Sequence, residues 1–144
     1  MPTTTSLTPE QLEFLLAGTR TAKLGYTAAD GRPLVAPVWF TVDGDEVTFC
    51  TGAETAKGRA MRRDPRVVVC VDLEAPPYAF VQIQGVAELI DDVAESRRIS
   101  TIVGARYMGA DRAEEFGARN GVPGEYTVRV KATKIIAALD MTAE

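Results

Sequence analysis

Two Asp-Gly pairs, Asp30-Gly31 and Asp43-Gly44, interrupt a stretch in which apolar and polar residues alternate. Asp-Gly is a strong signal for a tight β-hairpin, because glycine adopts the left-handed backbone conformation without a steric penalty. Alternation with a period of two is the pattern of strands that bury one face. The three alternating runs cover residues 21–27, 34–42 and 46–51. They predict an antiparallel meander of three strands.

Three further strands are expected downstream. Residues 66–73 are rich in consecutive valines, which is typical of a strand buried on both faces. Residues 79–90 alternate again, and Gly85 within them indicates a bulge or a close backbone approach. Residues 126–139 supply a last, long strand. Strands therefore dominate the chain.

Helices are expected at four places. The first begins with Thr8 as N-cap, Pro9 at the first helical position and Gln11 closing a capping box. Aspartate caps and helix formers place the other three over residues 54–64, from Asp91 or Asp92 to about Tyr107, and from Asp111 to near Gly121.

The chain of 144 residues suits one domain with one hydrophobic core, and no linker or internal repeat divides it. We therefore predict a single domain over residues 1–144. Its class is mainly β (α+β), and one barrel of antiparallel strands with short flanking helices is the simplest architecture.

Composition excludes several kinds of chemistry. The chain has no histidine, so histidine-based nucleophiles and histidine-ligated zinc or iron are impossible, and no oxygen-rich metal cluster is visible. Its two cysteines, Cys50 and Cys70, lie in strand-like runs and are expected in the core. No catalytic side chain stands out. If the protein is an enzyme, an organic cofactor supplies the chemistry.

Charge and hydropathy also restrict the partners. The net charge of −4 disfavours nucleic acid, whose phosphates reward a basic surface. No apolar run approaches the roughly 20 residues that span a bilayer, and the N-terminus lacks the pattern of a signal peptide. We therefore expect a cytoplasmic protein without a membrane segment.

Residues 51–66 carry the most informative pattern. A strand end passes through Gly52 into a predicted helix, whose N-terminus offers unpaired N–H groups and partial positive charge. The hydroxyls of Thr51 and Thr55 and the charge of Lys57 lie at the same end, which suits a phosphate. The alternative is a solvated helix face followed by a basic turn.

Four segments occur in an order and spacing that carry a resemblance: Asp30-Gly31-Arg32-Pro33, Pro37-Val38-Trp39-Phe40, residues 55–67, and Gln84-Gly85-Val86-Ala87-Glu88. Together they resemble the pyridoxamine 5′-phosphate oxidase-like, FMN-binding split-barrel superfamily. The similarity is greatest to its actinobacterial deazaflavin (coenzyme F420)-dependent reductases. It covers roughly residues 8–140 and implies a split β-barrel.

The resemblance also implies a site. Its members are homodimers with a cofactor groove at the interface, and residues Pro37, Val38, Trp39 and Phe40 would line the cofactor ring. Thr51, Thr55, Ala56 and Lys57 would hold its phosphate or adjoining tail. Arg62 and Arg63 would contact the acidic tail or simply end the helix. Trp39 is otherwise a core residue. Gln82 and Gln84 face either solvent or, across the dimer, the partner chain or the cofactor.

The implied activity is that of an F420-dependent oxidoreductase, in which reduced coenzyme F420 transfers hydride to an activated small molecule such as an enone or quinone. Two alternatives stay open: an FMN-dependent oxidase or reductase of the same fold, and a non-catalytic flavin- or F420-binding protein. Oxidation of vitamin B6 is disfavoured, because the C-terminal end lacks the histidine and the further arginine that bind the substrate phosphate in the oxidases.

Overall fold

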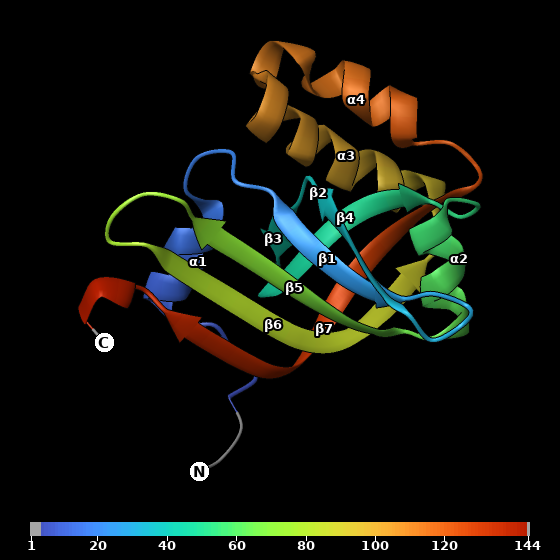
Figure 1. Ribbon diagram of the computed structural model, residues 1–144. Coiled ribbons are helices and arrows are strands. Elements are labelled where there is room, and N and C mark those ends of the chain that lie inside the picture. Colours follow the sequence, from blue (N-terminus) through green and yellow to red (C-terminus); the bar gives the residue numbers. More distant parts are fainter. Residues whose placement is uncertain (1–3, 144) are drawn as a thin grey trace.

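The computed structural model describes residues 4–143, which form one antiparallel sheet with four helices around it (Figure 1). The strands are β1 (Ala22–Thr27), β2 (Pro33–Val38), β3 (Thr41–Asp43), β4 (Glu46–Gly52), β5 (Arg66–Leu73), β6 (Ala79–Ile90) and β7 (Glu125–Ala138). Their order across the sheet is β2-β1-β5-β6-β7-β4-β3, so the sheet curves but keeps two edges. The predicted class, mainly β with flanking helices, is confirmed.

The four helices are α1 (Pro9–Leu16), α2 (Ala56–Arg63), α3 (Val93–Met108) and α4 (Ala113–Asn120). In Figure 1, α3 and α4 lie together across the top of the sheet, with α1 and α2 at opposite ends. The predicted capping box of Thr8 and Gln11 is present, and Asp92 caps α3. The prediction that Asp111 caps the last helix is wrong. Asp111 lies in a separate 3₁₀ turn, Ala110–Arg112, and α4 starts at Ala113 without a side-chain cap.

Both Asp-Gly hairpins form, but the meander is wrong. β1 pairs with β2 across the first turn, and β3 pairs with β4 across the second. In the second turn Gly44 and Asp45 have φ values of 57° and 76°, as a two-residue hairpin loop of type I′ requires. The predicted strand over residues 34–42 breaks at Trp39, and the chain crosses from one edge of the sheet to the other. The alternation of apolar and polar residues continues through the break, because this pattern depends on which side chains are buried and not on which strands pair.

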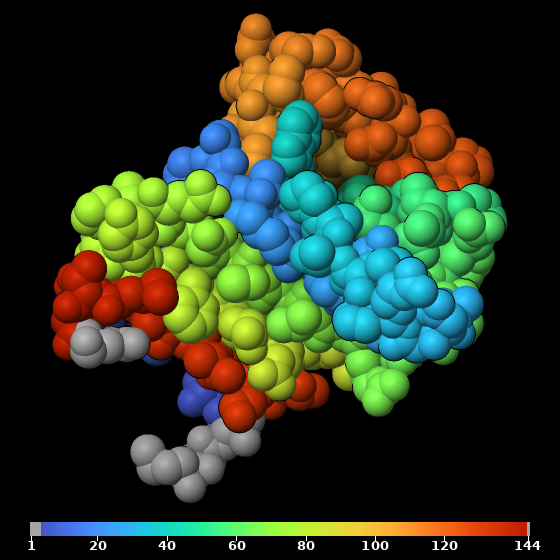
Figure 2. Space-filling view, viewed as in Figure 1, coloured from blue at the N-terminus to red at the C-terminus, as the bar shows by residue number. Residues whose placement is uncertain are grey.

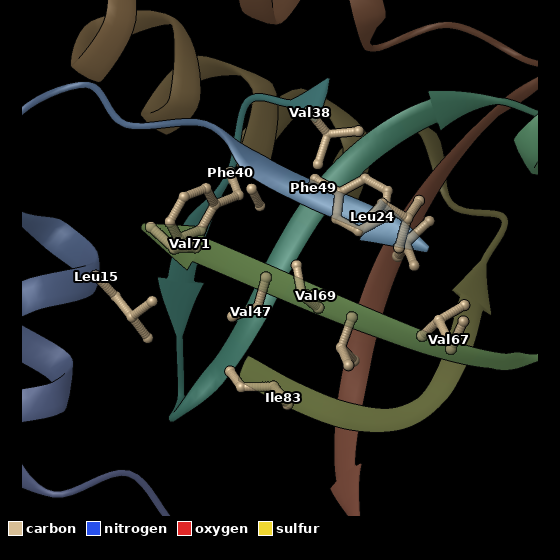
Figure 3. Packing of buried hydrophobic residues seen from close by; sticks show 14 of the residues in the cluster. Leu15, Leu24, Val38, Phe40, Val47, Phe49, Val67, Val69, Val71 and Ile83 are labelled. Carbon is tan, nitrogen blue, oxygen red and sulfur yellow. The ribbon is translucent and has the colours of Figure 1, made fainter. Parts of the chain in front are cut away.

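The hydrophobic core fills the concave side of the sheet. Figure 3 shows Leu24, Phe49 and Val69 converging there, and α1 adds Leu15. β5 was expected to be buried on both faces, but only its inward-facing valines, Val67, Val69 and Val71, are buried. Its other face, which includes Val68 and Cys70, is half-buried in this chain. The prediction of two buried faces is therefore wrong for the single chain.

Gly85 marks the bulge that the sequence predicts. The register between β6 and β7 shifts between Gln84 and Gly85. A Cβ atom at Gly85 would lie 2.4 Å from the carbonyl oxygen of Lys131, so only glycine allows the strands to approach this closely. A bulge bends the strand that carries it, and β6 is visibly curved in Figure 1.

Candidate functional site

A groove lies between the α3–α4 pair and the strands beneath it. The space-filling view shows a recess between these helices and the segment that includes β4 and the start of α2 (Figure 2). The helices pack closely because Gly104 of α3 leaves room for Phe116 of α4. A Cβ atom at Gly104 would lie 2.6 Å from the Cβ of Phe116. The position of Phe116 beside the groove therefore depends on that glycine.

The groove consists of two connected hollows. The inner hollow, of about 290 Å³, and the outer one, of about 360 Å³, share five residues: Trp39, Cys50, Lys57, Phe116 and Asn120. The inner hollow is lined in addition by Pro37, Val38, Ser100, Val103 and Gly104. The outer hollow is lined in addition by Thr51, Gly52, Thr55, Arg119 and Glu125. The residues found only in the inner hollow are all uncharged, whereas the outer hollow adds charged groups of both signs.

Aromatic rings form one wall of the groove. Trp39 stacks on Tyr107 with ring centroids 5.0 Å apart and planes 3° apart, and Phe116 lies 6.0 Å away at a tilt. The Tyr107 hydroxyl donates a hydrogen bond to the carbonyl of Arg20 at 2.7 Å and accepts one from the N–H of Phe40 at 3.3 Å. The end of α3 thus holds the backbone of Phe40, directly after Trp39, and the backbone of Arg20, just before β1.

Arg106, next to Tyr107, reinforces this arrangement. Its guanidinium donates to the carbonyls of Phe40, Leu15 and Gly18 at 2.8, 2.7 and 3.1 Å. Burial lowers the pKa of Arg106, and its charge lies over the ring of Phe40 at 4.6 Å. One side chain therefore ties α1, the strand break and α3 together.

The polar end of the groove is the start of α2. Thr55 is the N-cap, and its Oγ1 accepts a hydrogen bond from the N–H of Gly58 at 3.1 Å and lies 3.1 Å from the Oγ1 of Thr51. The N–H groups of Ala56 and Lys57, the first two helical residues, have no acceptor within the helix. A positively polarised seat results, with the Lys57 ammonium at its side.

Glu125 introduces a carboxyl group at this same end. It lines the outer hollow with Lys57 and Arg119. Burial raises the pKa of Glu125, and the charge of Lys57 opposes that rise. Burial likewise raises the pKa of the Cys50 thiol, which is only half-buried and faces the groove. The expectation that Cys50 belongs to the core is therefore wrong, because its strand turns this side chain toward α3. Cys70 is half-buried too, on the outward face of β5.

Six of the predicted site residues meet in this groove: Pro37, Val38, Trp39, Thr51, Thr55 and Lys57. Ala56 adds only its N–H group. The side chain of Phe40 is fully buried in the core, and its backbone N–H and carbonyl are both engaged by α3. Arg62 donates to Glu54 and to the Tyr126 hydroxyl, each at 3.3 Å, and Arg63 is exposed; neither lines the groove.

Sequence reasoning missed the other wall of the groove. Cys50, Ser100, Phe116, Arg119, Asn120 and Glu125 come from segments that had no motif. The predicted helices showed only that something would cover the sheet. Nothing in the sequence indicated which residues of α3 and α4 would face Trp39.

A separate hollow of about 730 Å³, distinct from the groove, lies on the outward face of β1, β5 and β6. Gln82 and Gln84 line it, and the amide of Gln84 donates to that of Gln82 at 3.0 Å. Apolar side chains are exposed on this face, among them Val86 of β6 and Ile136 of the neighbouring β7, each with an exposed fraction of 39%. The half-buried Val68 belongs to this face.

Within residues 4–143, no helix is long and apolar enough to cross a membrane. The same residues contain no cluster of three or more acidic or cysteine side chains that could hold a metal ion. The groove is lined by aromatic rings, by hydroxyl and amide groups, and by the charged side chains of Lys57, Arg119 and Glu125.

Comparison with known proteins places this geometry in a family. The sequence matches the pyridoxamine 5′-phosphate oxidase family over residues 7–137, while no curated protein sequence matches it. A conserved hypothetical protein, Rv2991 of Mycobacterium tuberculosis, has a similar structure, with a TM-score of 0.83, 23% identity, and coverage of 99% of this chain and 92% of that one. The predicted split-barrel fold is thereby confirmed.

Two further structures show the range of proteins with this fold. An F420 reductase is 24% identical with a TM-score of 0.67, covering 90% of this chain and 98% of that one. HutZ, the heme storage protein of Vibrio cholerae, is 16% identical with a TM-score of 0.71, covering 95% of this chain and 99% of that one. At these identities the likeness concerns the fold.

Proposed function

Because this chain belongs to the pyridoxamine 5′-phosphate oxidase family, we propose that it is an oxidoreductase that binds a phosphorylated flavin-type cofactor in the groove beneath α3 and α4. We propose coenzyme F420 as that cofactor and an activated small molecule, such as an enone or quinone, as the hydride acceptor. One observation carries the proposal: an anion seat and an aromatic wall adjoin in a single groove.

The residues present fit such a group. The unpaired N–H groups at the start of α2, the Lys57 ammonium and the Thr51 and Thr55 hydroxyls suit a phosphate. Trp39 and Phe116 offer flat apolar surface for a ring. Glu125 opposes an anion when ionised, although burial favours its neutral form.

When bound, a reduced deazaflavin supplies the hydride, and the chain supplies binding, orientation and exclusion of water. The α3–α4 pair shields the inner hollow from one side. Tyr107 and Arg106 fix the backbone beside Trp39, so that the ring wall keeps its orientation. No side chain is assigned as proton donor to the product.

Two observations bear on the choice of cofactor. The similar F420 reductase supports F420, and FMN is the alternative for the same seat. The similar heme storage protein points to another alternative, namely that a protein of this fold binds heme without catalysing a reaction. This chain has no histidine in its sequence, so it cannot supply the imidazole ligand that many heme proteins use.

We also propose that the outward face of β1, β5 and β6 pairs with a second copy of the chain. Exposed Val86 and Ile136 and half-buried Val68 give it an apolar surface that a partner would cover. A stable homodimer should bury more than about 1,000 Å² in total. Light scattering at micromolar concentration should therefore give twice the mass of the chain; a monomer would contradict the pairing.

Substitution of Lys57 tests the anion seat. Lys57→Ala removes one charge-assisted contact, worth about 1.5–3 kcal/mol, so the Kd for F420 or FMN should rise about ten- to hundredfold. Trp39 is the single tryptophan of the chain and lines the groove, so its fluorescence reports binding directly. The matched control is Arg59→Ala, which removes the same charge from an exposed position of the same helix.

Three outcomes separate the hypotheses. Weaker binding in Lys57→Ala alone supports the seat, whereas equal weakening in both variants indicates only long-range electrostatics. Tight binding of both cofactors that neither variant changes contradicts the site. Absorbance changes during turnover with reduced F420 and a quinone then distinguish an enzyme from a cofactor carrier.

A further inference from the structure

Ser100 of α3 carries a buried hydroxyl without a partner. Its exposed fraction is 3%, and among the side chains of residues 4–143 its Oγ is the one buried polar atom that lacks a hydrogen bond. Ser96, one turn earlier on the same helix, is equally buried but well satisfied. Its Oγ lies 3.2 Å from the Oγ1 of Thr127 and 3.4 Å from the carbonyl of Glu125. Native proteins rarely leave such a hydroxyl unpaired without a reason.

The unpaired hydroxyl lines the inner hollow. Burial raises the pKa of the Cys50 thiol, and the Ser100 hydroxyl lies close enough to that thiol to oppose the rise. A thiol is nevertheless a weak hydrogen-bond partner, and Cys50 already approaches the carbonyl of Ser96 at 3.7 Å. Asn120 of α4 lines the same hollow and brings a carboxamide with both a donor and an acceptor. The remaining walls are apolar, from Val38, Val103 and Phe116. The hollow therefore combines apolar walls with a few convergent uncharged polar groups, and Lys57, which it shares with the outer hollow, is its one charged lining residue.

This combination selects a ligand chemistry. An imide edge presents a carbonyl, an N–H and a second carbonyl in a row, that is, an acceptor, a donor and an acceptor. A carboxamide beside a hydroxyl can present the complementary row of a donor, an acceptor and a donor. Ser100 and Asn120 carry no charge, and Lys57 lies where the inner hollow meets the outer one, so the Ser100 and Asn120 side of the hollow suits an uncharged polar edge. The volume of about 290 Å³ lies at the lower limit of ordinary ligand sites, which suits part of a ring system.

We infer that Ser100 and Asn120 bind the imide edge of a planar ring, which in the proposed function is the pyrimidinedione edge of the deazaflavin or flavin. This assignment rests on the proposed function and adds the direction in which the ring lies. The imide edge points toward α3 and α4, and the phosphate-bearing tail points toward the start of α2.

The experiment uses ring probes that lack a phosphate. Lumiflavin carries the imide but no tail, and N3-methyl-lumiflavin has its imide N–H blocked. Binding of each probe to the full chain is followed by Trp39 fluorescence. For the wild type, N3-methylation should raise the Kd at least tenfold. Ser100→Ala should raise the Kd for lumiflavin about fivefold, as expected for one neutral hydrogen bond. Asn120→Leu should abolish most of the difference between the two probes.

Stability provides a readout that separates binding from structure. Removing an unpaired buried hydroxyl is neutral or stabilising, so the Tm of Ser100→Ala should equal or exceed that of the wild type. The matched control is Ser96→Ala, which removes a satisfied hydroxyl. It should lower the Tm and leave the ratio of the two probe affinities unchanged. Because Lys57 also lines the inner hollow, Lys57→Ala should weaken FMN binding much more than lumiflavin binding, and it should leave the ratio of the two probe affinities unchanged.

The outcomes separate this inference from the proposed function. If FMN or F420 binds with dependence on Lys57, while lumiflavin binding ignores Ser100, Asn120 and N3-methylation, the imide assignment is wrong and the cofactor site stands. If a changed KM for the acceptor is the only effect of Ser100→Ala, the hydroxyl contacts substrate and the assignment is again overturned. If neither cofactor nor lumiflavin binds the wild type, both proposals fail.

Discussion

Gly58 fixes the distance between the start of α2 and the turn before it. A Cβ atom at this position would lie 2.3 Å from the carbonyl oxygen of Gly52 and 2.9 Å from that of Ala53. A Cβ atom does not stay within 3.0 Å of a carbonyl oxygen, and a backbone carbonyl cannot rotate away as a flexible side chain can. Gly58→Ala must therefore move the helix start away from the turn by about 0.7 Å or more. The N–H groups of Ala56 and Lys57 move with it.

The expected magnitude follows from two opposing effects. Overpacking typically costs about 1–3 kcal/mol, and replacing glycine by alanine inside a helix returns up to about 1 kcal/mol. We therefore expect a net loss of about 1 kcal/mol in the free energy of unfolding, measured by urea denaturation, together with weaker binding of FMN or F420. Arg59→Ala, one residue further and exposed, should change neither. A Gly58→Ala protein that is more stable than the wild type and binds normally would refute the close packing.

Three further predictions concern charge. Arg129 contacts the carboxylates of Asp43, Glu46 and Glu95, with its own side chain 15% exposed, so Arg129→Met should lower the free energy of unfolding by about 2–4 kcal/mol in urea denaturation. Hydrogen bonds, first from Arg98 and then from Arg129, lower the pKa of Asp43 to about 2, which is below the value in the unfolded chain. The ionised Asp43 therefore stabilises the fold above about pH 4, and this stabilisation is lost as the pH falls toward 2. Acid titration of the fold would show the loss. Burial raises the pKa of Glu125, which lines the outer hollow with Lys57, Arg119 and Cys50, so the affinity for an anionic cofactor should fall as the pH rises through that pKa. Glu125→Gln should flatten this pH dependence in fluorescence titrations. An unchanged profile would show that the charge of Glu125 does not affect cofactor binding.

The sequence predicts local structure well where one residue determines the backbone. The hairpin turns at Gly31 and Gly44, the capping box at Thr8 and the bulge at Gly85 all follow from the conformational range of single residues. It predicts less where tertiary packing decides. The run 34–42 alternates without interruption, yet its strand breaks at Trp39, because burial of Phe40 and Val38 satisfies the pattern in either arrangement.

The same distinction holds for the site. The polar end could be predicted, because a threonine N-cap followed by lysine concentrates its groups within one turn of chain. The aromatic and inner parts could not. Ser100, Phe116 and Asn120 become neighbours of Trp39 only through the packing of α3 against α4, which depends on Gly104. Neither period nor motif encodes that contact in the sequence.

The strand break links the stability of the fold to the geometry of the groove. Side chains of an extended chain alternate, so the step that buries Phe40 in the core turns Trp39 outward into the groove. The N–H and carbonyl of Phe40 no longer pair within a strand, and Tyr107 and Arg106 take their place as partners. Because Arg106 also holds the end of α1, the wall on which we expect a ring to lie is fixed by contacts that the fold needs anyway. Pre-organised sites bind with little further ordering, and these contacts hold the backbone beside Trp39 without any help from a ligand.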